Sequence, residues 1–391
     1  MNKRIFAIST LVLVLLTGTI FVYNFAFKKS APQTTAPKTN DEGKTAPTSS
    51  ASNSDSKKST QTDQSVAIAA ISDTPVFGVA LAPDGSSIYY FAGDNGQADQ
   101  IDLDGKLEKV LSTEEFQNIQ QVLWNKPRNK ALVKRAGNAG KLKFLLLDLT
   151  QKTVVSVKDN VDSIAWSALG DKLIYKYYDA RTKKRSLEVS DPNGANWRKI
   201  ADISFFGVSI SPIPGSSDIS FWPSPDAFTS ASVNSIGFNG ENRKEILKNH
   251  FGVDFFWSPD GKSAAVSYTD QKGGHKTDLA FMNTDGGQFH SLDFPTFAKK
   301  CAWSADSKFL YCAMPGNIPD SAILPNDWQE GKIRTADTFW KIESATGKKT
   351  RLIEAVKING SFDALSPFLS QDEKTLFFTN KADGKLYKLG L

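Results

Sequence analysis

The residues that could support catalysis or bind a metal ion are few and widely separated. The chain of 391 residues has 3 histidines, His250, His275 and His290, and they form no spaced motif. A structural or catalytic zinc site draws on about four His, Cys or carboxylate ligands, so we expect no metal and no cofactor. Acidic residues are numerous, but no pair shares a context that would mark a general acid and base. We therefore predict no catalytic residues and a protein that is not an enzyme.

The two cysteines give a sharper expectation. Residues 305–308 form the centre of a predicted hairpin, and mirror pairing about this turn sets Trp303 opposite Leu310. The same register sets Cys301 opposite Cys312. Directly paired residues have Cβ atoms about 4.5–5.5 Å apart, and a disulfide needs roughly 3.5–4.5 Å. A disulfide fits an oxidising compartment, whereas two reduced, buried thiols are the alternative.

These residues belong to a repeated hairpin. In residues 251–266 an apolar run ends in Trp257, a Ser-Pro-Asp-Gly turn follows, and a second apolar run begins. Such a pattern predicts two antiparallel strands joined by a tight turn. A recurrence every roughly 40–50 residues is typical of a β-propeller. The last apolar residue before the turn predicts seven blades, at Leu81, Trp124, Trp166, Ile210, Trp257, Trp303 and Leu365.

Each repeat supplies four strands of an all-β fold. In the first repeat they are predicted at residues 77–82, 86–91, 98–103 and 107–111. The last repeat has no fourth strand after residues 385–391, and residues 66–71 are an unassigned strand at the other end of the chain. We predict that this strand completes the last blade, because a closed ring removes exposed sheet edges.

The N-terminal 29 residues have the pattern of a membrane anchor. Lys3 and Arg4 precede an uncharged run at residues 5–27, and Lys28 and Lys29 follow it. At about 1.5 Å per residue, a helical run of this length spans a bilayer core of roughly 30 Å. A cleaved signal peptide is the alternative, but residues 23–27 make a poor cleavage site. We predict a single-pass anchor at residues 1–29 with a cytoplasmic N-terminus.

Residues 30–65 are rich in Ser, Thr and Pro and contain no aromatic or large aliphatic residue. Such a segment cannot bury enough apolar surface to offset its ordering entropy. We predict a flexible linker that joins the anchor to an extracytoplasmic propeller at residues 66–391.

The hairpin motifs resemble a known family. Leu-Ala-Pro-Asp-Gly-Ser at residues 81–86 and Trp-Ser-Pro-Asp-Gly-Lys at residues 257–262 are similar to the TolB-type, WD-like propeller repeat, and the resemblance covers residues 66–391. Weaker copies begin at Trp166 and Trp303, and Trp124-Asn125-Lys126-Pro127 departs from the pattern. The resemblance implies an extracytoplasmic propeller that supports protein–protein contacts. No Gly-x-Ser-x-Gly motif is present, so we do not expect the hydrolase domain that follows some related propellers.

The predicted topology puts the long loops on one face of the propeller. Residues 222–228 and 313–337 are the longest insertions, and the second either covers the central channel or contacts a ligand. Aromatic and basic residues of this face are candidate ligand contacts, with core packing and an ordinary solvated surface as the alternatives. They are Phe205, Phe206, Trp222, His250, Phe251, Phe297, Trp328, Arg181, Lys183 and Lys184.

The composition limits the partners. A formal net charge of +5 is small for 391 residues and does not indicate nucleic-acid binding. We expect the long-loop face to bind a protein or an anionic envelope polymer. The alternatives are a propeller-type polysaccharide lyase or glycosidase with carboxylates at the channel mouth, and a purely structural envelope protein. A deep pocket with clustered carboxylates would indicate the enzyme, and a broad aromatic and basic surface would indicate binding.

The paired cysteines can be tested directly. In protein made outside the cytosol, non-reducing peptide mapping should recover Cys301 and Cys312 in one linked peptide pair. Two free thiols in that preparation would show the pairing to be wrong.

Overall fold

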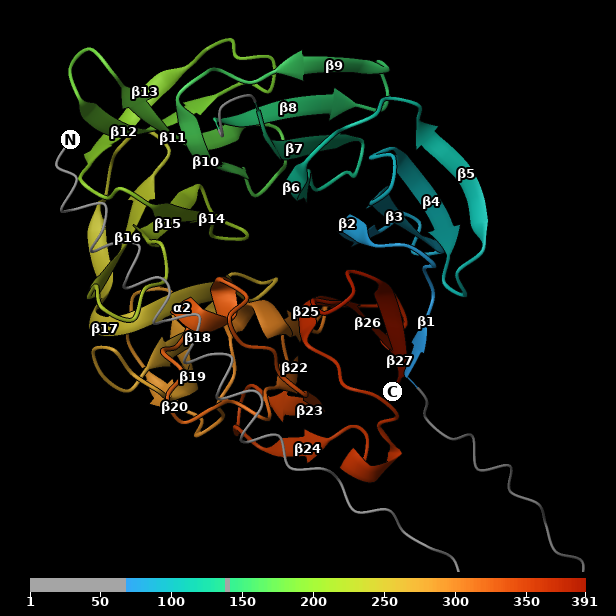
Figure 1. The fold of residues 1–391 in the computed structure, drawn as a ribbon. Coiled ribbons are helices and arrows are strands. Elements are labelled where there is room, and N and C mark those ends of the chain that lie inside the picture. The colour runs from blue at the N-terminus through green and yellow to red at the C-terminus, as the bar shows by residue number, and fades with distance from the viewer. Residues whose placement is uncertain (1–67, 138–140) are drawn as a thin grey trace, which may run out of the picture. The chain divides into compact units, whose positions relative to one another are not determined.

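A computed structural model describes residues 68–137 and 141–391. In these residues the chain is almost entirely antiparallel strand. The sheets follow one another around a common centre (Figure 1). The helical elements of this part are short: α2 (Asn326–Gln329) and the 3₁₀ turns η2 (Ala298–Lys300) and η3 (Ala355–Lys357). The prediction of a propeller built from four-stranded antiparallel sheets is confirmed.

The predicted membrane anchor and linker lie outside the described residues. Within residues 68–137 and 141–391, no helix is long and apolar enough to cross a membrane.

The first three sheets have four strands each, in chain order. They are β2 (Val76–Leu81), β3 (Ser87–Ala92), β4 (Ala98–Asp102) and β5 (Leu107–Ser112); β6 (Ile119–Trp124), β7 (Lys130–Ala136), β8 (Leu142–Asp148) and β9 (Thr153–Ser156); and β10 (Val161–Trp166), β11 (Leu173–Asp179), β12 (Lys184–Ser190) and β13 (Arg198–Ile203). The strands of the first sheet differ from the predicted ones by one residue at most at either end.

The next sheet has seven strands because one of them serves two neighbours. Its strands are β14 (Val208–Pro212), β15 (Asp218–Pro223), β16 (Ala231–Gly237), β17 (Lys244–Trp257), β18 (Ser263–Thr269), β19 (Thr277–Asn283) and β20 (His290–Ser291). The first half of β17 pairs with β16 up to His250, and the second half pairs with β18 from Phe251 onward. Asn249 and Gly252 have positive φ at the join, which lets the chain change sheets without a loop.

The last two sheets bring the chain ends together. One contains β21 (Cys301–Trp303), β22 (Phe309–Met314), β23 (Thr338–Glu343) and β24 (Lys349–Arg351), and the other contains β25 (Ala364–Leu369), β26 (Thr375–Asn380), β27 (Leu386–Gly390) and β1 (Ile68–Ala70). Ile68 pairs with Leu389 and Ala70 with Tyr387. The prediction that the N-terminal strand completes the last sheet is therefore confirmed.

Apolar clusters lie between successive sheets. The cluster that joins the two ends of the chain contains Ile88 and Ile101 from the first sheet and Phe377 and Leu386 from the last. Equivalent clusters join each of the other neighbouring groups of four strands. The core is thus a ring of interfaces between sheets rather than a single centre.

The recurring tryptophan has a structural role in these interfaces. The indole N–H of Trp166 donates to the Leu123 carbonyl at 2.8 Å, and that of Trp303 donates to the Phe256 carbonyl at 3.1 Å. Each bond reaches the inner strand of the preceding sheet. A buried indole needs such an acceptor, so the repeat preserves both the ring and its partner.

Two of the predicted anchor positions were wrong. The anchor is the residue in the last strand pair before the turn, as Trp257 is when it pairs with Ala264. In β14 this residue is Pro212, which pairs with Ile219, and in β25 it is Leu369, which pairs with Leu376. The predicted residues Ile210 and Leu365 lie earlier in their strands. Proline is tolerated in β14 because this is an edge strand, and a bulge between Leu365 and Phe368 lengthens β25.

Replacing Trp303 tests the interface bond. Trp303→Phe keeps an aromatic ring but leaves the Phe256 carbonyl without its donor, so the free energy of unfolding should fall by about 1–2 kcal/mol. Urea unfolding followed by circular dichroism measures the change. Trp197→Phe is the control, because that side chain is 55% exposed, and it should change the value by less than about 0.5 kcal/mol. Equal losses in the two variants would contradict this role.

Candidate functional site

A cavity of about 780 Å³ is lined mainly by the inner strands of the sheets. It receives residues from β6, β10, β14, β17 and β25, and also from η2. Inner strands are sheet edges that face the centre of the ring, and their lining side chains include both apolar and polar residues. Those with polar, uncharged side chains include Gln121, Ser163, Ser209, Ser211, Ser224 and Ser366.

Four charged side chains also line this channel cavity. Lys134 comes from β7, Asp162 from β10, Asp254 from β17 and Lys299 from η2. The Lys299 ammonium lies 3.9 Å from the Asp254 carboxylate, and Asp162 pairs with the ammonium of Lys176 at 2.6 Å. The four charged residues come from four different parts of the chain, which only the folded propeller brings together.

The cavity shifts the proton affinity of two of these groups. Burial lowers the pKa of Lys134, and the nearby Lys299 cation lowers it further against the attraction of Asp162. Burial raises the pKa of Asp254, while Lys299 and the Phe255 N–H act in the opposite direction. An amine with a lowered pKa is a candidate base. The Lys299 side chain is 54% exposed and can meet an anion.

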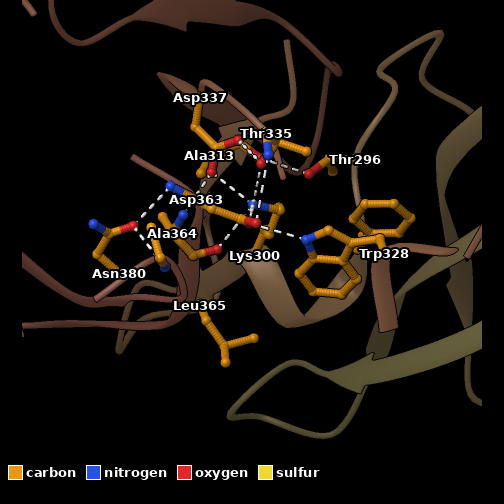
Figure 2. A network of polar contacts seen from close by, with 12 residues as sticks. Thr296, Lys300, Ala313, Trp328, Thr335, Asp337, Asp363, Ala364, Leu365 and Asn380 are labelled. Carbon is orange, nitrogen blue, oxygen red and sulfur yellow. Dashed lines mark hydrogen bonds and ion pairs between the residues drawn. The ribbon is translucent and has the colours of Figure 1, made fainter. Parts of the chain in front are cut away.

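Lys299 is positioned by the residue that follows it. Lys300 does not line the cavity, and its side chain lies in a fully buried polar network (Figure 2). Its ammonium donates to Asp337 at 2.6 Å, to Asp363 at 2.7 Å and to Thr335 at 3.0 Å. Because the two lysines are adjacent in η2, the network that holds Lys300 also fixes the backbone that carries Lys299.

The two buried carboxylates of this network are not equivalent. Burial raises the pKa of Asp337 despite the adjacent Lys300 ammonium. Burial acts in the same direction on Asp363, but Lys300 and hydrogen bonds from Trp328 and Thr335 outweigh it and lower the pKa of Asp363. The Trp328 indole donates to Asp363 at 2.9 Å and its ring lies 5.1 Å from the Lys300 ammonium. The pKa of Asp363 is thus lowered and that of Asp337 raised, although both carboxylates contact the Lys300 ammonium.

The long 315–337 loop also contacts the connections of several other sheets. Asn326 donates to Asp226 at 3.0 Å, the Leu324 N–H donates to the Gly274 carbonyl at 3.0 Å, and Lys381 donates to the Trp328 carbonyl. None of the residues that line the channel cavity comes from this loop, as far as the described residues go. The hydrogen bonds given above join this loop to other loops.

The structure separates the sequence-predicted ligand residues into two groups. Most are packed: Trp222, Phe297 and Trp328 are buried, Phe205 packs against an apolar cluster, Phe251 is part-buried opposite Thr269, and His250 contacts Tyr268 and Phe289. The rings of Phe297 and Trp328 stack with their centroids 4.4 Å apart. Of these buried residues, Trp222 also lines the channel cavity.

The other predicted residues are exposed. Phe206 is 79% exposed in the connection between β13 and β14. Arg181, Lys183 and Lys184 are exposed where β11 turns into β12, and they do not line the channel cavity.

Cys301 and Cys312 are directly paired across β21 and β22, and their sulfur atoms are bonded. The disulfide lies in the buried cluster between the sheets of β18–β20 and β21–β24. Its register is the one that mirror pairing about the turn predicts.

Sequence reasoning did not select the channel charges. Lys134, which lies within β7, was not among the predicted ligand residues, and neither were Asp162, Asp254 and Lys299. A signal was present: these three residues precede the tryptophan anchors Trp166, Trp257 and Trp303 by three or four positions. A polar residue at the start of an inner strand is exposed to the channel and not to the core.

Comparison with known proteins supports the fold and leaves the family open. No protein-family model matches the sequence, and no curated protein matches it. An oligogalacturonate lyase from Vibrio parahaemolyticus has a similar structure, with a TM-score of 0.61 and 12% identity over 84% of this chain and 94% of the lyase. An oligogalacturonate lyase in complex with manganese has a TM-score of 0.59 and 15% identity over 81% and 89%. A β-propeller domain from Myceliophteria thermophila has a TM-score of 0.56 and 11% identity over 83% and 99%.

These neighbours correct one prediction. We expected a protein that is not an enzyme because no catalytic motif is visible in the sequence, and that expectation is wrong: two of the similar structures are lyases. In a propeller, side chains from separate sheets meet at the channel. A catalytic group can therefore form without any local sequence motif.

The manganese of one neighbour has no evident counterpart here. In residues 68–137 and 141–391, no group of three or more His, Cys, Asp or Glu side chains is arranged to hold a metal ion. The charged groups that line the channel cavity are two lysines and two aspartates. This donor set does not fit a metal centre.

The buried lysine can be tested by an isosteric change. Lys300→Met leaves two buried carboxylates without their cation, so the free energy of unfolding should fall by about 3–5 kcal/mol. Chemical unfolding of the purified protein measures it. Lys308→Met is the control, because that side chain is 73% exposed and should change stability by less than about 0.5 kcal/mol.

The two carboxylates should also respond differently. Asp337→Asn should cost less stability than Asp363→Asn, since the raised pKa of Asp337 and the lowered pKa of Asp363 favour a neutral group only at the first position. The reverse order, or no loss in Lys300→Met, would contradict this assignment.

Proposed function

We propose that the chain is a seven-bladed propeller enzyme that cleaves an acidic polysaccharide by β-elimination in the channel cavity. Counting β17 once in each of the two sheets that it joins gives seven groups of four strands. The observation that carries the proposal is the placement of Lys134 and Lys299 in one cavity with Asp254. The similarity to oligogalacturonate lyases supports it at the level of fold.

The two lysines suit the two demands of this reaction. The carboxylate of a uronic-acid residue must be neutralised before the proton on the adjacent carbon can leave. Lys299 can supply this cation because its contact with Asp254 is long, at 3.9 Å, and its side chain is half exposed. Lys134 can supply the base, since its lowered pKa increases the fraction of neutral amine near neutral pH.

The proposed step conserves atoms and charge. The neutral Lys134 amine takes the proton from the carbon next to the carboxylate, and that electron pair forms a carbon–carbon double bond. The bond from the neighbouring carbon to the glycosidic oxygen breaks. The departing oxygen then takes the proton from the Lys134 ammonium, which returns the amine to its starting state. The products are a new chain end and an unsaturated sugar.

The proposal includes a location. Residues 5–27 would hold the protein in the membrane with a cytoplasmic N-terminus, and residues 30–65 would let the propeller reach a polymer of the cell envelope on the outer side. The disulfide between Cys301 and Cys312 supports an oxidising compartment. A protein partner or a nucleic acid is not needed for this function.

Purified full-length protein in detergent should act on uronate polymers. Incubation with oligogalacturonate and with other uronate oligomers should yield products with a conjugated double bond, detected by ultraviolet absorbance and mass spectrometry. Lys134→Met should lower kcat by about 10²–10⁴-fold. For the unmodified enzyme the rate should rise with pH through the lowered pKa of Lys134, because the amine must be neutral to act.

The matched control is Lys272→Met, an exposed lysine in the connection between β18 and β19 that should leave kcat unchanged. New reducing ends without any unsaturated product would indicate hydrolysis and not elimination. Asp162 and Asp254 are the carboxylates of the channel cavity that could act in hydrolysis. No cleavage of any uronate polymer would overturn the proposal.

A further inference from the structure

A second cavity adjoins the channel on the long-loop face. Its volume is about 620 Å³, and Asp162 lines both this cavity and the channel cavity. We call it the lateral cleft. Its other lining residues come from the start of β8, from the connections before β10 and β14, and from β11 and β12; those with charged or aromatic side chains are Lys141, Lys143, Asp159, Lys176, Tyr178, Arg185 and Phe206.

A buried lysine holds the boundary between the two cavities. Lys176 is 1% exposed, and its ammonium pairs with the Asp162 carboxylate at 2.6 Å. The same ammonium donates to the carbonyl of Phe206. One cation therefore fixes both the carboxylate that the cavities share and the backbone that carries Phe206.

The Phe206 ring is exposed although its backbone is fixed. Its exposed fraction is 79%, and the guanidinium of Arg185 lies 4.0 Å from the ring centroid. Arg185 is also 5.1 Å from the Tyr178 ring. An aromatic ring that is held in place yet left in water is suited to stack on a flat apolar face of a ligand. The apolar face of a sugar ring is such a surface.

The charge of the lateral cleft selects for an anion. Lys141, Lys143, Lys176 and Arg185 line it, against the carboxylates of Asp159 and Asp162. Asp162 is already paired with Lys176, so the remaining cations outnumber the remaining carboxylate. A concave surface with an excess of one charge attracts ligands of the opposite charge.

We infer that the lateral cleft is a binding subsite for an acidic oligosaccharide, in which Phe206 stacks on one sugar ring while Lys143 and Arg185 bind carboxylates. A chain bound in the channel cavity would continue past Asp162 into this cleft. The inference rests on the proposed function, because it assigns the cleft to the same substrate. It makes Phe206 and Arg185 determinants of affinity for long chains and not catalytic residues.

Binding measured without turnover tests the subsite. The full-length Lys134→Met protein in detergent is titrated with end-labelled oligogalacturonates of increasing length, and fluorescence anisotropy gives Kd. Affinity should rise with length. Adding Phe206→Ala, or Lys143→Met with Arg185→Met, should weaken binding of the long oligomers about tenfold and leave that of the shortest unchanged.

The control removes the same number of positive charges from a surface outside the cleft. Arg181→Met with Lys183→Met, on the exposed turn between β11 and β12, should not alter the length dependence, and far-ultraviolet circular dichroism should show every variant folded. Equal affinity of the cleft variants and their parent for long oligomers would overturn the inference, as would an equal loss in the control.

The subsite and the reaction can fail separately. If the unmodified protein cleaves uronate polymers but the cleft variants bind long oligomers normally, only the subsite is wrong. If no cleavage occurs and the cleft variants still lose the length-dependent affinity, the subsite holds and the elimination reaction is wrong. No binding of any acidic oligomer by the parent overturns the subsite.

Discussion

Every sheet of this protein depends on being covered by its neighbours. Each one packs its apolar side chains against the next, and the series closes only where Ile88 meets Phe377 and where Ile68 pairs with Leu389. An open series would expose two apolar faces and two sheet edges. Closure also has a consequence at the centre. The inner strands keep one unpaired edge, and this edge faces a polar channel that can hold charges which the core would exclude.

The buried network around Lys300 is not explained by stability alone. Buried ion pairs often cost as much in desolvation as they return in attraction. Lys300 with its two aspartates therefore contributes through geometry: it ties the 315–337 loop to β25 and fixes η2. The adjacent Lys299 is thereby held at the channel cavity. A buried cluster outside the site thus supports a charge inside it.

The fold can be predicted from the sequence more fully than the channel site can. Trp303 and its equivalents mark the hairpins because an indole between sheets needs both apolar contact and an acceptor, and that requirement recurs at a fixed period. Proline in β14 and the bulge in β25 displaced two anchors because edge strands tolerate irregularities that the period does not reveal. The channel charges come from different sheets and have no shared motif. Asp162, Asp254 and Lys299 are marked only by their position three or four residues before a tryptophan anchor, and Lys134 in β7 shares no such position. Aromatic content misleads there, because Phe297 and Trp328 stack on each other in the core.

In the proposed reaction, Lys134 and Lys299 would act without any local sequence motif. Burial and the nearby Lys299 cation both disfavour the charged form of Lys134, and the result is the lowered pKa of that amine. Asp162 partly offsets this effect on Lys134, but its own ion pair is with Lys176. The ion pair between Lys299 and Asp254 is long, at 3.9 Å. A core built only for stability would pair or remove such charges. A cation with a long ion-pair contact beside a cavity, as Lys299 has, is instead suited to an anionic ligand, whose carboxylate would balance its charge.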